Sequence, residues 1–291
     1  MELAGIKMKN PVMAASGTFG WGREYADYLD LNKLGAIVTK SITLQPRAGN
    51  PPPRIVETAC GMLNSIGLQN EGIAHFLKED LPFLAKFDTP VIVNIAGETV
   101  EEYAELAALL SRATTVKGLE VNISCPNVKS GGMAFGVDPE LTKQVIAAVK
   151  KATSLPVIAK LTPNVTDITV IAKAAAAAGA DAISLINTLV GMSLDLETGQ
   201  SRLGTLTGGL SGPAIKPIAV RMVYEVARIM MVPVIGIGGI MTGDDAVEFL
   251  LAGAKAVQVG TANFVDTEAS LKVVKGIEDY VHRHPRALNL S

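Results

Sequence analysis

Cysteine, histidine and surplus charge are all scarce in this sequence of 291 residues. The only cysteines are Cys60 and Cys125, too few for a disulfide framework, which favours a reducing compartment. The three histidines fall in predicted helical or terminal segments, so no metal site is expected. The formal net charge is −2 and no long basic run occurs, which argues against a nucleic-acid or lipid surface.

Long apolar runs are missing as well. The longest, within 171–186, is interrupted by Lys173, Gly179 and Asp181 and is too short to cross a bilayer. Segment 1–17 has no long apolar core and no evident cleavage site, so we expect no signal peptide. Hydrophobic residues make up 48% and charged residues 19%, as in a globular chain. We therefore expect a cytoplasmic protein with no membrane or nucleic-acid partner.

Eight short β-branched runs alternate with helical patterns along the chain. Several lack in-out alternation, as is typical of parallel strands covered on both sides. We predict strands at 11–16, 36–40, 91–96, 119–124, 157–161, 182–187, 234–239 and 256–260. Their number and the chain length favour one α/β domain over residues 1–291, a (β/α)8 TIM barrel. An open doubly wound sheet is the alternative.

Helix boundary signals lie between these strands. Asp138 is a plausible N-cap with Pro139 just inside the helix that it starts. The helical pattern of 166–179 predicts a start at Thr166 and an end at Gly179.

Three segments fall outside the plain repeat. Residues 3–10 alternate between apolar and polar and are expected to form a small hairpin closing one end of the barrel. Segments 41–72 and 188–212 are rich in glycine and too long for simple strand-to-helix loops. Both follow strand ends, so they should lie over the catalytic face.

Polar side chains end six of the predicted strands, and glycines end the last two. The residues are Ser16, Lys40, Asn94, Asn122, Lys160, Asn187, Gly238 with Gly239, and Gly260 with Thr261. Catalytic groups of such barrels lie at these carboxyl ends, although strand ends are often polar simply because they approach solvent. The two lysines fit that simpler explanation less well, because a buried ammonium needs an anionic partner.

The glycines after the seventh and eighth strands predict a phosphate site, to which Gly212 could add another helix start. With the lysines and asparagines they indicate a phosphorylated, planar, polar cofactor, and flavin mononucleotide (FMN) fits. Asparagine amides can pair with both edges of its ring. Lys160 would stabilise the negative charge that reduction creates. A flavin-free phosphosugar enzyme could share this pattern, whereas a non-catalytic binding barrel would not need such converging polar groups.

Cys125 stands just past the fourth strand, in VNISCPNVKSGG. A cysteine there could be a nucleophile, a metal ligand or a general base. The distant second cysteine and the placement of the histidines do not support a metal role. A buried inert thiol is the alternative, and it fits Cys60 at least as well.

These motifs together resemble the dihydroorotate dehydrogenase family. NPPPR, GMLNSIGLQN, NISCPNVKSGG, INT, TGGLSGPAIKP, IGIGGI and AVQVGTANF follow the family's order nearly end to end. With cysteine at position 125, the sequence resembles the soluble class 1 enzymes and not the membrane-bound class 2 enzymes. Within class 1, ETACGMLNSIGLQN, NVKSGGMAFG and INTLVGMSLDLETG resemble the 1B catalytic subunit, not the fumarate-linked 1A homodimer.

The resemblance implies oxidation of (S)-dihydroorotate to orotate in de novo pyrimidine biosynthesis. A hydride would pass from C6 to FMN and the C5 proton to Cys125, with Lys40 and Lys160 as further catalytic residues. The implied substrate contacts are Lys40, Asn64, Ser65, Ile66, Gly67, Leu68, Asn122, Asn187 and Thr188. The implied FMN contacts are Ser16, Lys40, Ser41, Asn94, Asn122, Lys160, Ile186, Gly212, Gly238, Gly239, Gly260 and Thr261.

The resemblance also implies a partner. A second subunit would hold FAD and a [2Fe–2S] cluster and pass electrons to NAD, in a heterotetramer of two catalytic and two electron-transfer subunits with a catalytic homodimer within it. This chain has too few cysteines for the cluster, and its GIGGI segment is better interpreted as phosphate binding than as a dinucleotide fingerprint. A class 1A activity with fumarate, or a flavoenzyme acting on another pyrimidine, is the near alternative.

Overall fold

Eight parallel strands close into a barrel in the computed structural model, which describes residues 1–124, 126–127 and 133–288. They neighbour one another in the order β11-β12-β15-β16-β3-β4-β7-β8. Their bounds are β3 Val12–Ala14, β4 Ala36–Val38, β7 Val91–Ile95, β8 Val116–Asn122, β11 Val157–Leu161, β12 Ala182–Leu185, β15 Val234–Ile237 and β16 Ala256–Val259. Each predicted strand overlaps one of these, so the barrel is confirmed and the open sheet is excluded.

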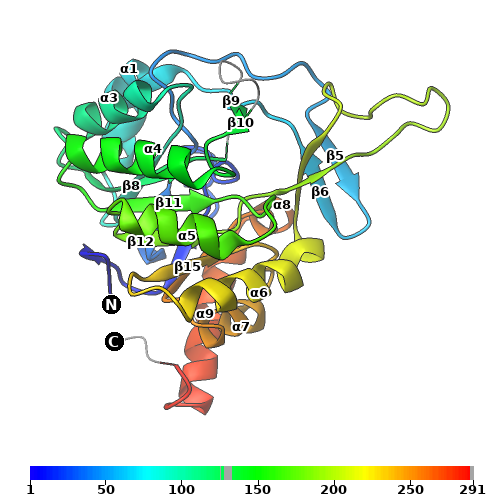
Figure 1. Ribbon diagram of the computed structural model, residues 1–291. Coiled ribbons are helices and arrows are strands. Elements are labelled where there is room, and N and C mark those ends of the chain that lie inside the picture. Colours follow the sequence, from blue (N-terminus) through cyan, green and yellow to red (C-terminus); the bar gives the residue numbers. More distant parts are fainter. Residues whose placement is uncertain (125, 128–132, 289–291) are drawn as a thin grey trace.

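Helices surround the barrel (Figure 1). Their bounds are α1 Gly72–His75, α2 Leu81–Leu84, α3 Val100–Leu110, α4 Pro139–Ala152, α5 Ile168–Ala177, α6 Lys216–Ala227, α7 Gly243–Leu251, α8 Ala262–Val265 and α9 Ala269–Arg283. Short turns of other helix types are η1 Leu31–Lys33, η2 Phe76–Asp80 and η3 Pro213–Ile215. The long helices bury one apolar face against the outside of the strands, which is why their apolar residues recur at three- and four-residue spacing.

The starts of two helices can be compared with the N-caps that the sequence predicts. Asp138 caps α4, because its side chain accepts hydrogen bonds from the backbone N–H groups of Glu140 and Leu141. For α5 the expectation was wrong by one residue. Asp167, not Thr166, is the N-cap, and its carboxylate accepts from Thr169 N. Both residues suit a cap, but the carboxylate of Asp167 is the one that the chain turns toward the free N–H groups.

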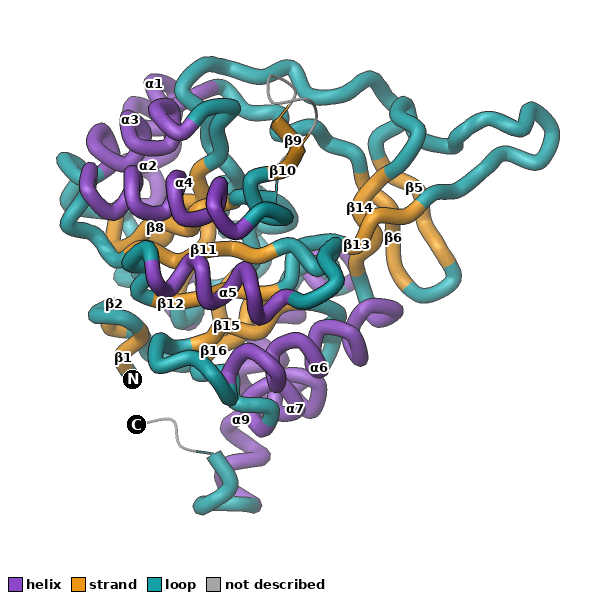
Figure 2. Tube along the Cα trace, in the orientation of Figure 1, coloured by secondary structure: helices purple, strands orange, loops and turns teal. Residues whose placement is uncertain are grey.

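The N-terminal hairpin pairs β1 Glu2–Leu3 with β2 Ile6–Lys7 and closes the amino end of the barrel, as expected (Figure 2). Its Leu3 and Ile6 pack, together with Met8, against apolar side chains inside the barrel, including Ile92 and Ile158. The barrel interior next to the hairpin is therefore an apolar core. Buried polar side chains of the barrel strands, among them Glu120, Ser184 and Gln258, bond to one another instead of joining this apolar cluster.

The two long segments meet in a four-stranded antiparallel sheet at the carboxyl end of the barrel, ordered β13-β14-β6-β5 (Figures 1 and 2). Its strands are β5 Ile55–Thr58, β6 Gly61–Asn64, β13 Leu189–Gly191 and β14 Gly208–Ser211. The loop between β13 and β14, residues 192–207, projects from the sheet as a long arm. A further short pair joins β9 Pro126–Asn127 to β10 Met133–Ala134. The expectation that both long segments lie over this face is confirmed.

Candidate active site

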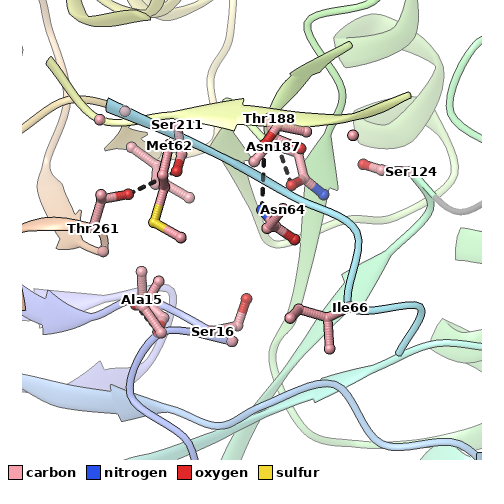
Figure 3. A pocket seen from close by; sticks show the side chains of 18 of the residues that line it. Ala15, Ser16, Met62, Asn64, Ile66, Ser124, Asn187, Thr188, Ser211 and Thr261 are labelled. Carbon is pink, nitrogen blue, oxygen red and sulfur yellow. Dashed lines mark hydrogen bonds between the residues drawn. The ribbon is translucent and has the colours of Figure 1, made fainter. Parts of the chain in front are cut away.

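A cavity of about 590 Å³ lies between the carboxyl ends of the barrel strands and the four-stranded sheet. This volume is within the range of cofactor and ligand sites, roughly 300–1,000 Å³. Figure 3 shows Met62 and Asn64 of the sheet on one side and Ala15 and Ser16 of the barrel on the opposite side. The sheet thus roofs the end of the barrel at which catalytic groups are expected.

One wall of the cavity is backbone without side chains. Gly212, Gly238 and Gly239 line it with φ values of +96°, +128° and +74°. A Cβ on Gly212 would lie 2.7 Å from the Cα of Gly61, and one on Gly239 would lie 2.9 Å from the carbonyl oxygen of Gly212. Only glycine therefore fits at these two positions. Backbone exposed in this way can approach a phosphate closely.

The nearest lysine to this wall is already paired. Lys216 begins α6 beside Gly239, and its ammonium lies 2.7 Å from Asp245 and 2.8 Å from Glu248. Hydrogen bonds to these two carboxylates raise the pKa of Lys216. Its charge is thus largely compensated, so an anion at the glycine wall would rely on backbone N–H groups.

The segment from Asn64 to Leu68 forms the opposite edge of the cavity. Asn50 holds its backbone, because Asn50 N donates to Ile66 O at 3.1 Å and the Asn50 amide donates to Ser65 O at 3.1 Å. Gly67 has φ +73°, and a Cβ there would lie 2.6 Å from Asn50. Leu68 has φ +56°, a left-handed conformation that is costly for a leucine and that the surrounding bonds must enforce.

An array of amides crosses the floor of the cavity. Asn187 Nδ2 donates to Asn122 Oδ1 at 3.3 Å, and Asn122 Nδ2 donates to Ser41 Oγ at 3.4 Å. The hydroxyl of Ser41 in turn donates to Oδ1 of Asn94, which is fully buried. Asn187 also accepts from Thr188 N at 2.8 Å. The array offers fixed donors and acceptors to a ligand with amide edges.

Two lysines face this array. Burial lowers the pKa of Lys40, and the nearby charge of Arg54 lowers it further, while Glu24 and Glu71 oppose these effects. Lys160 is buried and donates to Ser16 Oγ at 2.9 Å, with Glu120 Oε1 at 3.4 Å. Lys40 therefore lacks full compensation within the protein and would gain from a bound anion.

Two hydroxyls at the cavity are buried without a hydrogen-bond partner in the described part of the chain. They are Ser65 Oγ and Ser124 Oγ. A buried hydroxyl that lacks a hydrogen bond costs about 1–3 kcal/mol. These two hydroxyls therefore mark places where a polar ligand would bind. The donor set of the cavity suits an anionic, amide-rich ligand and a phosphorylated cofactor.

Almost all of the residues proposed from the sequence line this one cavity. Those that do are Ser16, Lys40, Ser41, Asn64, Ser65, Ile66, Gly67, Leu68, Asn122, Lys160, Ile186, Asn187, Thr188, Gly212, Gly238, Gly239, Gly260 and Thr261. Asn94 lies beneath the lining instead, bonded to Ser41 and Glu120. Cys125 lies outside the described residues. Cys60 is exposed in the turn between β5 and β6, so the expectation of a buried thiol there was wrong.

Sequence reasoning missed several residues of the site. Ser124 and Met62 line the cavity, and Glu120 lies directly below it. Glu120 stands two residues before Asn122 on β8, so the strand period of two places both side chains on the inner face. That period was the available signal. Nothing in the sequence marked Met62, because its place depends on the sheet that β6 forms with β14.

Over the described ranges, no group of three or more His, Cys, Asp or Glu residues could hold a metal ion. No helix in the same part of the chain has the length and apolar character needed to span a bilayer.

Comparisons with known proteins agree with the geometry. The model of a family described as dihydroorotate dehydrogenase matches residues 1–281. A protein of Geotalea daltonii named dihydroorotate dehydrogenase B (NAD(+)), catalytic subunit, is 61% identical over 284 residues, covering 98% of this chain and 93% of its own. A protein of the same name from Pelobacter propionicus is 60% identical with the same coverage.

A solved structure shares the fold. The chain superposes on the dihydroorotate dehydrogenase (DHODH) of Eimeria tenella, crystallised with ferulenol, with a TM-score of 0.81. The match covers 100% of this chain and 87% of that one at 23% identity.

Proposed function

The chain belongs to the dihydroorotate dehydrogenase family, and we propose on that premise that it is the catalytic subunit of an NAD-linked enzyme that oxidises (S)-dihydroorotate to orotate in pyrimidine biosynthesis. The observation that carries the proposal is the meeting, in one cavity, of an incompletely compensated Lys40, an ordered array of amides and a side-chain-free glycine wall. Each part matches one part of the reactants.

The glycine wall and the residues at the carboxyl ends of the barrel strands are proposed to hold FMN. Its phosphate would bind at Gly212, Gly238, Gly239, Gly260 and Thr261, where backbone lines the cavity. Its ring would be held by the proposed set Ser16, Lys40, Ser41, Asn94, Asn122, Lys160 and Ile186. Asn94 would act on the ring through Ser41, because it does not itself reach the cavity lining.

The substrate is an anion with amide edges. Lys40 would attract its carboxylate, and the segment from Asn64 to Leu68 would close over one face together with Thr188. Asn122 and Asn187 would bind its amide groups with donors and acceptors that are already oriented by each other. The unpaired hydroxyls of Ser65 and Ser124 would find partners on binding.

The chain's own residues perform the proton and charge work. FMN, when bound, supplies the acceptor for the hydride that leaves C6. Cys125, as thiolate, is proposed to remove the C5 proton, so that a C–H bond breaks and an S–H bond forms. Lys40 and Lys160 place positive charge beside the developing anionic sites, below the sheet that covers the cavity.

We propose further that the chain works in the cytoplasm with a second subunit carrying FAD and a [2Fe–2S] cluster, as a heterotetramer of two subunits of each kind. The name catalytic subunit, borne by the relatives, supports a partner. A catalytic homodimer within it is supported by exposed apolar side chains on the sheet and its arm, namely Ile55, Val190, Met192, Leu194, Leu196 and Leu206.

The electron acceptor that reoxidises the reduced flavin distinguishes the NAD-linked from the fumarate-linked alternative. The purified chain is loaded with FMN and reduced anaerobically by dihydroorotate. We expect it to stay bleached when NAD is added and also when fumarate is added. Addition of the electron-transfer subunit should restore oxidation by NAD. Direct recolouring by fumarate would contradict the NAD-linked assignment, and a protein that never binds FMN would contradict the flavin assignment.

A further inference from the structure

A carboxylate is buried inside the barrel beneath the cavity. Glu120 is fully buried and does not line the cavity, yet it lies within hydrogen-bond reach of residues that do. It shares the inner face of β8 with Asn122, one step closer to the amino end of the barrel. The activity proposed above gives this residue no role.

Four donors converge on the carboxylate of Glu120. Oε1 accepts from Asn94 Nδ2 at 2.7 Å and faces Lys160 Nζ at 3.4 Å. Oε2 accepts from Ser184 Oγ at 2.9 Å and from Gln258 Nε2 at 2.6 Å. All four donors come from other barrel strands and are themselves buried. Burying a charge is costly without such pairing, so this constellation is built around an ionised carboxylate.

An ionised carboxylate only accepts hydrogen bonds, and this fixes the array above it. Asn94 must direct its NH₂ group to Glu120, which turns its carbonyl oxygen toward the hydroxyl of Ser41. Ser41 is then free to accept from Asn122, whose carbonyl oxygen accepts from Asn187. Glu120 thus sets the directions of the bonds made by Asn94 and Ser41, while the backbone N–H groups of Ser124 and Thr188 hold the amides of Asn122 and Asn187 in the same sense.

The same carboxylate is the counter-charge of Lys160. The ammonium is held between Glu120 below and Ser16 Oγ at 2.9 Å beside the cavity. Both members of the pair are buried, so solvent screens their interaction little. The positive charge that Lys160 presents to the cavity is therefore smaller than that of a lone lysine, and its position is set from below.

We propose that Glu120 is a positioning residue that sets the place and the effective charge of Lys160 and thereby tunes the reduction potential of the flavin bound above it. The inference rests on the proposed FMN site. A negative charge below Lys160 disfavours added electrons in the cavity, and a positive charge favours them. Glu120 keeps the potential lower than Lys160 alone would make it.

The test is the midpoint potential of bound FMN in Glu120→Gln, which keeps the side-chain size and removes the charge. The expected result is a shift to more positive potential, because Lys160 loses its counter-charge. Glu105→Gln, an exposed change on α3, is the matched control and should leave the potential unchanged. An unchanged or more negative potential in Glu120→Gln overturns the proposal.

A double-mutant cycle separates positioning of Lys160 from a direct effect of the carboxylate on the flavin. In a Lys160→Met background, Glu120→Gln should shift the potential much less than it does in the wild type. Equal shifts in the two backgrounds overturn the role assigned to Lys160.

A milder variant guards against misfolding. Glu120→Asp keeps the charge but withdraws it by one methylene, and it should give a smaller positive shift than Glu120→Gln. If Glu120→Gln fails to fold, Glu120→Asp tests the proposal in its place. The absence of a positive shift of the FMN midpoint potential in Glu120→Asp then overturns the proposal. The potential is set with a chemical reductant, so the result is independent of dihydroorotate. Bleaching of the wild type by dihydroorotate, measured alongside, tests the proposed function separately.

Discussion

The side chains of Asn187 and Asn122, 65 positions apart in the chain, meet by a hydrogen bond of 3.3 Å from Nδ2 of the first to Oδ1 of the second. They follow or end β12 and β8, and the bond orients both amides toward the cavity. Asn187→Ala removes one proposed ligand contact, while Asn122 stays oriented by its bonds to Ser41 Oγ and Ser124 N. We expect orotate binding to weaken about 5- to 12-fold, since one lost hydrogen bond costs about 1–1.5 kcal/mol. Titration of the flavin absorbance with orotate measures this.

The control for this variant is Gln200→Ala, an exposed change on the arm. It should leave orotate affinity at the wild-type value. Equal loss of affinity in both variants, or no loss in Asn187→Ala, contradicts the assignment of Asn187 to the substrate.

Gly67 and Gly199 offer a matched pair of left-handed glycines. Their φ values are +73° and +67°, but a Cβ on Gly67 would lie 2.6 Å from Asn50, whereas nothing lies within 4 Å of one on Gly199. Gly199→Ala should cost about 1 kcal/mol of stability through backbone strain alone. Gly67→Ala should cost about 1–3 kcal/mol more and should raise the KM for dihydroorotate, because Asn50 holds the segment proposed to bind the substrate. Urea unfolding and steady-state kinetics of the two variants measure these effects. An equal loss of unfolding free energy in Gly67→Ala and Gly199→Ala would contradict the close contact at Gly67.

Lys40 gives a prediction on pH. Burial lowers its pKa in the folded protein below the value of 10.5 that it has in the unfolded chain. Between these two pKa values the unfolded state binds more protons, so this residue makes stability rise with pH over that window. Below the window its buried charge is a constant penalty. Lys40→Met should therefore stabilise the ligand-free protein at neutral pH and flatten the alkaline rise, while weakening orotate binding more than tenfold.

Denaturant unfolding of the ligand-free protein at neutral and alkaline pH checks the Lys40 prediction. Lys173→Met, an exposed change on α5, serves as the control and should alter neither stability nor affinity. A Lys40→Met protein that is less stable than the wild type at neutral pH would show that the lysine has a partner in the folded state.

The projecting arm gives a prediction on assembly. Leu196 at its tip is 97% exposed, and Leu206 is also exposed. If these side chains are buried between two catalytic chains, Leu196→Asp with Leu206→Asp should convert a dimer into a monomer by light scattering, because a charge there would lose its water on association. Met231→Asp, at a residue that is 101% exposed beyond α6, should leave the mass unchanged. A dimer that survives the arm substitutions would place the interface elsewhere.

The barrel could be predicted because each strand carries its own signal, a short β-branched run followed by a polar or glycine end. The lining of the cavity could be predicted where polar residues follow those ends, as at Lys40 and Asn187. The sheet over the cavity could not, because β5, β6, β13 and β14 become recognisable as a unit only when two distant segments pair. Glu120 was missed for a related reason, since its partners Ser184 and Gln258 come from distant strands.

The central claim is that this cavity oxidises dihydroorotate by hydride loss to FMN and proton loss to Cys125. The most direct measurement is rapid anaerobic mixing of dihydroorotate with the FMN-loaded wild type and with Cys125→Ser, following the flavin absorbance. The wild type should bleach and yield one orotate per FMN, and the variant should keep its FMN but bleach slower by orders of magnitude, because a hydroxyl is a poor base at neutral pH. A wild type that stays yellow would contradict the substrate assignment, and equal bleaching rates would contradict the role of Cys125.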